Sequence, residues 1–358
     1  MHSVRRASQL HTHTSHFPVE TRNPFNLTIK LFVLSAVMLL ALTGQQNAMA
    51  QSDVPGTPVS AQGGVAHDQK AGSVLIYPVY TSLASASNLQ NSRISMTNVD
   101  TRGDVAVHLF FVDGSNCSVA DSYVCLTANQ TTTFLMSDLD PGITGYVVAV
   151  AVNSLGCPIN FNWLIGDSYV KFGTGQAANL GAIAVGALPG LEEVPCSAGS
   201  PLATLRFDGL SYNPLPRTLA ADSLPDRPSG NETLLVIDRI GGNLATTAAT
   251  LGSVFGLLFN DEETPVSFSF TQNVCQFRAL LSNNFPRTTP RYTTVIPTGH
   301  TGWMKLWTLD DGAIVGATLN FNPNATTAPG AFNQGRNLHT LTVTTAASYT
   351  IPVFPPTC

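Results

Sequence analysis

Residues 105–111 read Val-Ala-Val-His-Leu-Phe-Phe, and this stretch decides the fold class. Successive side chains of a β-strand point to opposite faces, so the residues at 105, 107, 109 and 111 share one apolar face. Helices instead repeat their apolar residues every three or four positions. The stretch therefore predicts a strand, at residues 105–113, with one face in a protein core.

Similar runs recur along the chain and predict an all-β protein. In the first half we expect strands at residues 74–80, 93–98, 105–113, 131–137, 145–153 and 169–172. Short strands separated by turns at this spacing are typical of Ig-like β-sandwiches. One helix is expected, at residues 176–187, where small side chains predominate.

The composition agrees with this fold class. The chain of 358 residues is 44% hydrophobic and only 11% charged, against about 25% charged in ordinary soluble domains. It is too apolar for a disordered protein. Charged residues, which usually cover the surface of long helices, are too few for a helical fold.

The first 50 residues read as an export signal. Basic residues precede an apolar run at residues 31–42, and Ala48-Met49-Ala50 supplies a small-residue cleavage site. The run is too short for a bilayer core of roughly 30 Å, so no membrane span is expected in the mature chain. A signal peptide at 1–50 predicts a secreted, periplasmic or cell-surface protein.

After the cleavage site, residues 51–72 are polar and rich in Gly and Pro, and we expect a flexible lead-in. The chain from residue 51 onward holds 13 basic and 21 acidic residues, a formal net charge of −8 against −5 for the whole chain. It has no cluster of Lys or Arg of the kind that binds phosphate backbones. The sequence therefore argues against a nucleic-acid partner.

All six cysteines follow the expected cleavage site. An even number of cysteines in an exported chain favours disulfides over metal binding, and neither a CxxC motif nor zinc-type Cys/His spacing occurs. The expected pairs are Cys117 with Cys125, closing a short loop, Cys157 with Cys196, and Cys275 with Cys358.

The chain divides into two halves of similar order. Pro and turn residues concentrate in residues 188–230, so we place a boundary near residue 200, between β-sandwich domains at 73–200 and 201–358. The segments 74–80, 94–98, 105–109 and that from residue 145 match 233–240, 256–260, 266–270 and 312–321 at offsets of 160 to 167 residues, and Cys117 matches Cys275 at an offset of 158. A nearly constant offset favours a duplication, although strands also align by accident because they resemble one another.

Residues 303–307 read Trp-Met-Lys-Leu-Trp. In a strand Trp303, Lys305 and Trp307 point one way, while Met304 and Leu306 point the other way. If Met304 and Leu306 face the core, the two indole rings lie outward, about 13 Å apart along the strand. Aromatic platforms beside a cation suit sugar rings or a partner protein. The sequence favours the other arrangement, in which the tryptophan face itself forms a core or packs against the first half, with Lys305 at its rim.

Acidic residues precede a strand at matching places in the two halves. Asp138 and Asp140 come before the strand at 145–153, and Asp310 and Asp311 come before the segment from residue 312. Carboxylates on such loops can hold Ca²⁺, although ordinary turn residues give the same pattern. Calcium is the only cofactor that the sequence suggests.

No catalytic motif is present. The chain has neither GxSxG nor HExxH, and its histidines after the leader are His67, His108, His300 and His339. Residues 173–178 match the nucleotide pattern GxGxxA, but no alternation of strands and helices surrounds them, which favours a glycine turn. A Ser/His/Asp triad is recognised by geometry rather than by order, so activity stays open while the sequence favours a non-catalytic protein.

Within residues 73–172 the segments SVLIYPVY, RISMTN, HLFFVDGSNCSVADSYVCLT and SDLDPGITGYVVAVAV carry a family resemblance. This part of the chain resembles uncharacterised exported bacterial proteins and, more loosely, Ig-like sandwich modules. The resemblance implies bacterial origin and export, and it transfers no functional residue.

Together these features predict an exported structural or adhesive protein of the cell surface or extracellular space. Its partner would be a surface glycan, another protein or a second copy of the chain. The runner-up is a carbohydrate-binding module that uses Trp303 and Trp307, and the third is an extracellular hydrolase. Exposed tryptophans would favour sugar binding, an unpaired edge strand would favour self-association, and a cleft with His300 or His339 beside Ser and Asp would favour a hydrolase.

Overall fold

The computed structural model describes residues 57–58, 64–188, 196, 199, 201–327 and 331–357. The predicted leader, residues 1–50, lies outside these described residues. Within the described ranges the chain is mostly β-strand, with two four-residue helices, α2 (Met136–Leu139) and α3 (Tyr292–Val295). The prediction of an all-β, sandwich-type fold is confirmed.

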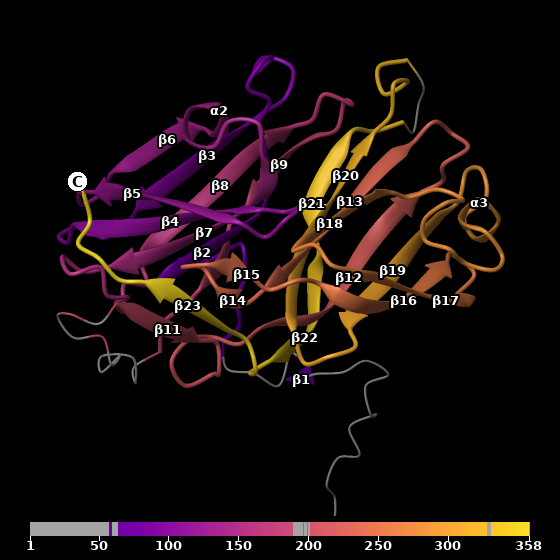
Figure 1. Ribbon diagram of the computed structural model, residues 1–358. Coiled ribbons are helices and arrows are strands. Elements are labelled where there is room, and N and C mark those ends of the chain that lie inside the picture. Colours follow the sequence, from indigo (N-terminus) through magenta and orange to yellow (C-terminus); the bar gives the residue numbers. More distant parts are fainter. Residues whose placement is uncertain are drawn as a thin grey trace, which may run out of the picture. The chain divides into compact units, whose positions relative to one another are not determined.

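The first half of the chain builds two facing sheets (Figure 1). Their strands are β2 (Val74–Thr81), β3 (Asn91–Asn98), β4 (Val105–Asp113), β5 (Val119–Leu126), β6 (Thr131–Leu135), β7 (Thr144–Val152), β8 (Leu164–Lys171), β9 (Ala177–Gly181) and β10 (Ile183–Val185). The five-stranded β7 sheet has the order β10-β2-β7-β4-β5, and the four-stranded β3 sheet has the order β6-β3-β8-β9. Alternate residues of both, among them Leu109, Val147 and Ile94, meet in one core.

The second half, together with the short strand β1 from the expected lead-in, builds another pair of sheets. Their strands are β1 (Thr57–Pro58), β12 (Leu215–Pro225), β13 (Glu232–Ile240), β16 (Gly252–Asn260), β17 (Pro265–Gln272), β18 (Gln276–Leu280), β19 (Thr301–Thr308), β20 (Ala313–Phe321), β21 (Gln334–Asn337) and β22 (His339–Thr344). The six-stranded β19 sheet has the order β1-β22-β12-β19-β16-β17, and the β20 sheet has the order β18-β13-β20-β21. Leu219, Leu258 and Leu306 of the β19 sheet pack against Leu235 and Ile314 of the β20 sheet.

A fifth sheet connects the two halves. Its strands are β11 (Leu202–Arg206), β14 (Gly242–Asn243), β15 (Thr247–Ala248) and β23 (Ser348–Pro352), in the order β11-β23-β14-β15. Leu205 and Tyr349 of this sheet share a buried cluster with Phe110 and Val148, which lie on the second face of the β7 sheet. Figure 1 shows β23, in yellow, and the chain after it beside strands of the first half.

Residues on both sides of the expected boundary near residue 200 share this buried cluster, and the division into domains at 73–200 and 201–358 stays a prediction. Residues Asp53–Cys358 form one compact unit. His67, in the expected flexible lead-in, exchanges backbone hydrogen bonds with Ala184 of β10, so this part of the lead-in belongs to the fold.

Strand pairing follows the predicted duplication only in part. β2 pairs with β7, and β13 pairs with β20, as the matched positions require. β4, however, pairs with β5 and β7, whereas its matched strand β17 pairs with β16. The halves share one strand pair and differ in the neighbours of the strands that follow.

No helix forms at residues 176–187, so that prediction was wrong. The alanines favour a helix locally, but propensity is a weak guide and pairing with β8 overrides it here. The Phe172 N–H donates to the Gln176 carbonyl and closes a hairpin, so that β9 folds back along β8. The GxGxxA pattern is thus a glycine turn between two strands.

Two disulfides join described cysteines, Cys117–Cys275 and Cys157–Cys196. The second confirms a predicted pair. The predicted Cys117–Cys125 bond was wrong, because Cys117 lies in the turn before β5 and Cys125 lies near the far end of that strand. Eight residues of strand span about 26 Å, whereas bonded cysteines have Cα atoms about 6 Å apart.

The predicted Cys275–Cys358 bond was also wrong, because Cys275 is bonded to Cys117. Cys125 is disulfide-bonded as well, and Cys358 lies outside the described residues.

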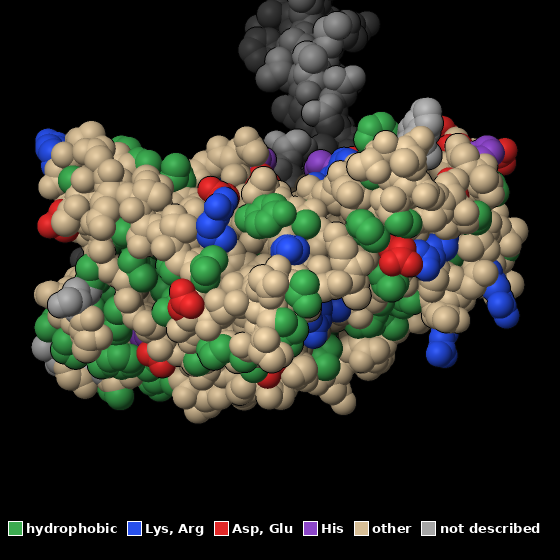
Figure 2. Space-filling model, turned by 90° about the horizontal axis from the view of Figure 1, so that it is seen from above, with side chains coloured by type: hydrophobic (Ala, Val, Ile, Leu, Met, Phe, Trp, Pro, Cys, Tyr) green, Lys and Arg blue, Asp and Glu red, His purple; other side chains and the backbone are tan. Residues whose placement is uncertain are grey.

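The surface carries few charges. On the face shown in Figure 2, backbone and uncharged polar side chains cover most of the area, and acidic and basic side chains are scattered among them. Neither of the two described helices has the length and hydropathy needed to cross a membrane.

Candidate functional site

The predicted tryptophan pair lies on β19, an inner strand of the β19 sheet. β19 pairs with β12 on one side and with β16 on the other. Met304 and Leu306 are fully buried in the core between the β19 and β20 sheets. Because side chains alternate along a strand, Trp303, Lys305 and Trp307 lie on the opposite, outer face, where each is partly exposed.

Two phenylalanines of β16 complete this surface. Phe259 is the register partner of Trp303, and their rings stack with centroids 4.4 Å apart and planes inclined by 7°. Phe255 is the partner of Trp307, with ring centroids 5.0 Å apart at 47°. We call the five residues Phe255, Phe259, Trp303, Lys305 and Trp307 the aromatic face.

Lys305 places a cation among these rings. Its Nζ lies 5.7 Å from the centroid of Phe259 and 5.5 Å from that of Trp303. Both distances fall within the range of cation–π attraction. The other neighbouring strand, β12, presents the smaller side chains Thr218 and Ala220 opposite Trp307 and Lys305. Large aromatic partners therefore flank the indoles on the β16 side only.

The two phenylalanines were missed by sequence reasoning. Phe255, Leu257 and Phe259 alternate with the buried positions Val254 and Leu258 in Gly252–Asn260, so the signal was present. This alternation places the two phenylalanines beside the tryptophans only if β16 is known to pair with β19, and the sequence does not specify that pairing.

The carboxylates predicted to bind Ca²⁺ have other partners. Arg239 donates to both oxygens of Asp310, at 2.8 and 2.9 Å, and these hydrogen bonds lower the pKa of Asp310. Arg217 forms an ion pair with Asp311. In the described part of the chain no three His, Cys, Asp or Glu side chains gather where they could hold a metal ion.

The other predicted pair lies at α2. The Tyr80 hydroxyl donates to Asp140, and burial raises the pKa of this carboxyl. Asp138 is the acidic residue of the first turn of α2 and accepts a hydrogen bond, at 3.4 Å, from Ser137. Calcium binding at these four residues stays a prediction.

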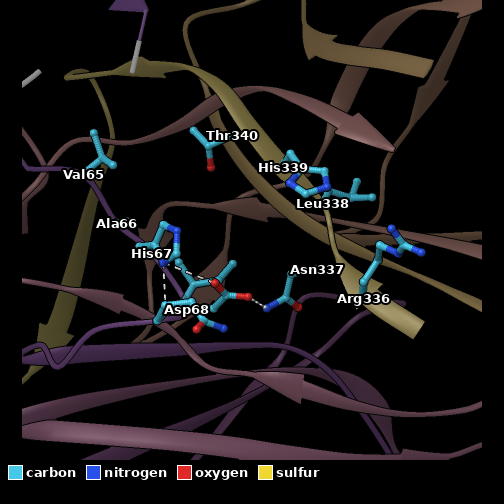
Figure 3. Close-up of a pocket in the computed structure, with 11 residues that line it drawn as sticks. Val65, Ala66, His67, Asp68, Arg336, Asn337, Leu338, His339 and Thr340 are labelled. Atoms are coloured by element: carbon cyan, nitrogen blue, oxygen red, sulfur yellow. Dashed lines mark hydrogen bonds and ion pairs between the residues drawn. The ribbon is translucent and has the colours of Figure 1, made fainter. Parts of the chain in front are cut away.

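A cavity of about 470 Å³ lies between residues 65–69 and the strands β21 and β22 (Figure 3). Val65, Ala66, Ile183 and Leu338 give it apolar walls. The size falls in the range of small-molecule sites, roughly 300–1,000 Å³.

Polar groups of this cavity pair with one another. Asn337 Nδ2 donates to Asp68 at 2.9 Å. Asp222 of β12 accepts from Arg336 at 2.7 Å and lies 3.3 Å from His339 Nε2. His339 lines the cavity and Asp222 does not, whereas His67 and Asp68, 3.3 Å apart, form a His–Asp pair in which both residues line it.

A hydrolase would also need a nucleophile beside that histidine. The Ser223 hydroxyl donates to Asp222, at 3.3 Å, and not to His339. His300 forms a similar pair with Asp261, at 2.7 Å. No hydrogen bond joins a serine hydroxyl to a histidine ring among the described residues. The described geometry therefore supplies the His–Asp pairs of a triad without a nucleophilic serine beside them.

The fourth histidine is structural. His108 is fully buried on β4, with its Nε2 2.9 Å from Asp121 and its ring stacked on Tyr123 at a centroid distance of 4.2 Å. Burial lowers the pKa of His108, and the neighbouring Asp121 opposes this shift.

Comparison with protein-family models, with curated proteins and with solved structures found no match to this chain.

Proposed function

We propose that the protein is an exported adhesive protein that binds saccharides through the aromatic face. The observation that carries this proposal is the complete burial of Met304 and Leu306. With these two side chains in the core, the alternation of β19 leaves both tryptophans on the outer face of the sheet.

The chemistry of this face suits a sugar. Aromatic rings offer flat apolar surface to the C–H groups of a pyranose, while the indole N–H of a tryptophan can donate a hydrogen bond. The Lys305 ammonium adds donors for hydroxyl or carboxylate oxygens. The stacked phenylalanines hold the indoles in place, so that less side-chain freedom is lost when a ligand binds.

Export is supported by the cysteine chemistry. Disulfides persist in oxidising compartments and are rare in the cytosol, and two join described cysteines in this chain. The apolar run and cleavage motif before residue 51 support the same location.

The proposal is tested with a glycan array followed by titration calorimetry of the best ligand. We expect Trp303→Ala and Trp307→Ala each to weaken binding about fivefold to thirtyfold, because a lost aromatic contact is worth about 1–2 kcal/mol. Trp163→Ala is the matched control, since Trp163 is 51% exposed and lies away from the aromatic face. It directly precedes β8, a strand of the β3 sheet.

Thermal unfolding of each variant separates lost binding from lost folding. Binding that survives both substitutions on β19, or that is lost equally in Trp163→Ala, contradicts the proposal.

A further inference from the structure

The outer edge of the β19 sheet is a long strand without charges. β17 pairs with β16, and in the described part of the chain it pairs with no other strand. Its sequence, Pro265-Val-Ser-Phe-Ser-Phe-Thr-Gln272, has no ionisable side chain. Unpaired backbone groups on such an edge are a template for another strand, and proteins ordinarily block them with charges, prolines, bulges or covering segments.

Most of the other described edges carry such protection along the strand, whereas on β17 it is limited to Pro265, the first residue. Four edge strands contain a charged residue: β5 has Asp121, β11 has Arg206, β18 has Arg278 and β21 has Arg336. β1, β10 and β15 are two or three residues long.

Two edges remain to be compared with β17. β9 is covered by β21, since Asn337 Nδ2 donates to the Gly181 carbonyl at 2.8 Å. β6 is uncharged, but it has five residues and runs directly into α2. β17, with eight residues, is the long uncharged edge of the described structure.

The backbone groups of β17 divide into two sets. A strand residue directs its N–H and C=O to the same side, and Pro on an edge strand sits with its nitrogen toward solvent. The nitrogen of Pro265 therefore points away from β16. Every second residue after it, Ser267, Ser269 and Thr271, directs its backbone N–H and C=O the same way. The 2.8 Å contact between the hydroxyls of Ser253 and Thr271 agrees, because side chains approach most closely at pairs without backbone hydrogen bonds.

We propose that β17 is a self-association edge, which pairs antiparallel with β17 of a second copy of this chain. A two-fold axis at Ser269 sets Ser269 opposite its counterpart and Ser267 opposite Thr271 of the second copy. These three side chains are exposed on the outer face of the sheet. The pairing joins two six-stranded sheets into one continuous sheet.

The side chains at this edge are compatible with self-pairing. Hydroxyl pairs already bridge neighbouring strands in this molecule, as between Thr97 and Thr131 at 2.8 Å. No like charges meet across the axis, which would oppose pairing. The acidic residues Asp261, Glu262 and Glu263 precede the strand and lie outside the paired span.

The test uses opposite charges at the axis. In Ser269→Lys or Ser269→Glu, each copy sets its new charge against the same charge of its partner, whereas a mixture of the two variants sets opposite charges together. Thr133→Lys is the matched control, because it adds a charge at an exposed position of another edge strand, β6.

Sedimentation velocity at about 100 µM, where weak association is detectable, gives the readout. We expect the wild type and Thr133→Lys to form a dimer, each Ser269 variant to dissociate about tenfold or more readily, and their equimolar mixture to recover the dimer. A wild type that stays monomeric at about 500 µM, or Ser269 variants that dimerise as well as the wild type, overturns the proposal. Saccharide binding is a separate readout, so this result leaves the proposed function to its own test.

Discussion

Asp238 carries a completely buried carboxyl group. Its Oδ1 accepts a hydrogen bond from Gln276 Nε2 at 2.8 Å, whereas its Oδ2 has no hydrogen-bond partner. Burial raises the pKa of Asp238 well above its ordinary value, and the hydrogen bond from Gln276 and the charge of Arg278 only partly oppose the shift. The folded protein therefore holds a proton here at pH values at which the unfolded chain has lost it.

We expect Asp238→Asn to stabilise the protein at neutral pH. A carboxyl whose pKa is raised on folding favours the folded state below its unfolded pKa, near 3.8, and that stability is lost as the pH rises through the folded pKa. A neutral amide avoids this loss, so the free energy of unfolding should rise by about 1–3 kcal/mol at pH 7.

Urea denaturation at pH 7 and at pH 4 measures this effect, with the exposed Asp167→Asn as control. The gain in the free energy of unfolding from Asp238→Asn should be smaller at pH 4 than at pH 7. A variant that is less stable than the wild type at pH 7 would show that Asp238 is held as a charged partner of Arg278.

Single residues show how far sequence reasoning reaches. Alternation placed Met304 and Leu306 correctly opposite the tryptophans, because an inner strand obeys the period of two. Alternation could not show that His108 is buried. Its side chain points to the face of β4 opposite Val107 and Leu109, and that face is buried too. Phe354, from the far end of the chain, packs its ring 5.1 Å from that of His108, and such a contact leaves no local signal.

At the scale of elements, the strands with continuous apolar runs were the most predictable. β4 has the predicted bounds, and β2 and β7 differ from theirs by one residue. β5 was missed, because its burial pattern is irregular and its sequence Val-Ala-Asp-Ser-Tyr-Val-Cys-Leu lacks a regular alternation. Fold class was therefore predictable, while the order of strands within each sheet was not.

The close pairing of β4 with β7 makes a sharp prediction about Gly145. A Cβ atom at this position would lie 1.8 Å from the carbonyl oxygen of Val112. Relieving that clash requires the two strands to move apart, so we expect Gly145→Ala to lower the free energy of unfolding by about 3 kcal/mol or more.

Gly173→Ala is the matched control, because the nearest atom to its added Cβ, Gln90 Oε1, is 3.4 Å away. Chemical denaturation should place this control within about 0.5 kcal/mol of the wild type. Equal stabilities of the two variants would show that the backbone at Gly145 is looser than described.

At the scale of the whole molecule, the Cys117–Cys275 bond joins the two halves across 158 residues. Pairing of these matched cysteines could not be predicted, because it depends on how the halves meet. Disulfides stabilise mainly by restricting the unfolded chain, and more so for longer loops. We expect Cys117→Ala/Cys275→Ala to lose about 2–5 kcal/mol of stability.

Thermal unfolding of the double variant measures that loss, and a peptide map without reduction checks the bond itself. The map should recover Cys117 linked to Cys275, and a fragment that links Cys117 to Cys125 would refute the arrangement of the halves.

The low charge of the chain also belongs to this scale. With 11% charged residues, solubility rests largely on hydroxyl, amide and backbone groups at the surface. Several of the acidic residues are already engaged, as Asp310 and Asp222 are with arginines. This distribution agrees with a protein that binds through apolar rings and uncharged edges.

Tryptophan fluorescence of Trp163→Phe during saccharide titration tests the central claim most directly. The chain has three tryptophans, so in this variant all indole emission comes from Trp303 and Trp307. We predict a saturable change in emission whose midpoint equals the calorimetric dissociation constant. Binding that is measured by calorimetry but leaves this emission unchanged would contradict the claim that the aromatic face contacts the ligand.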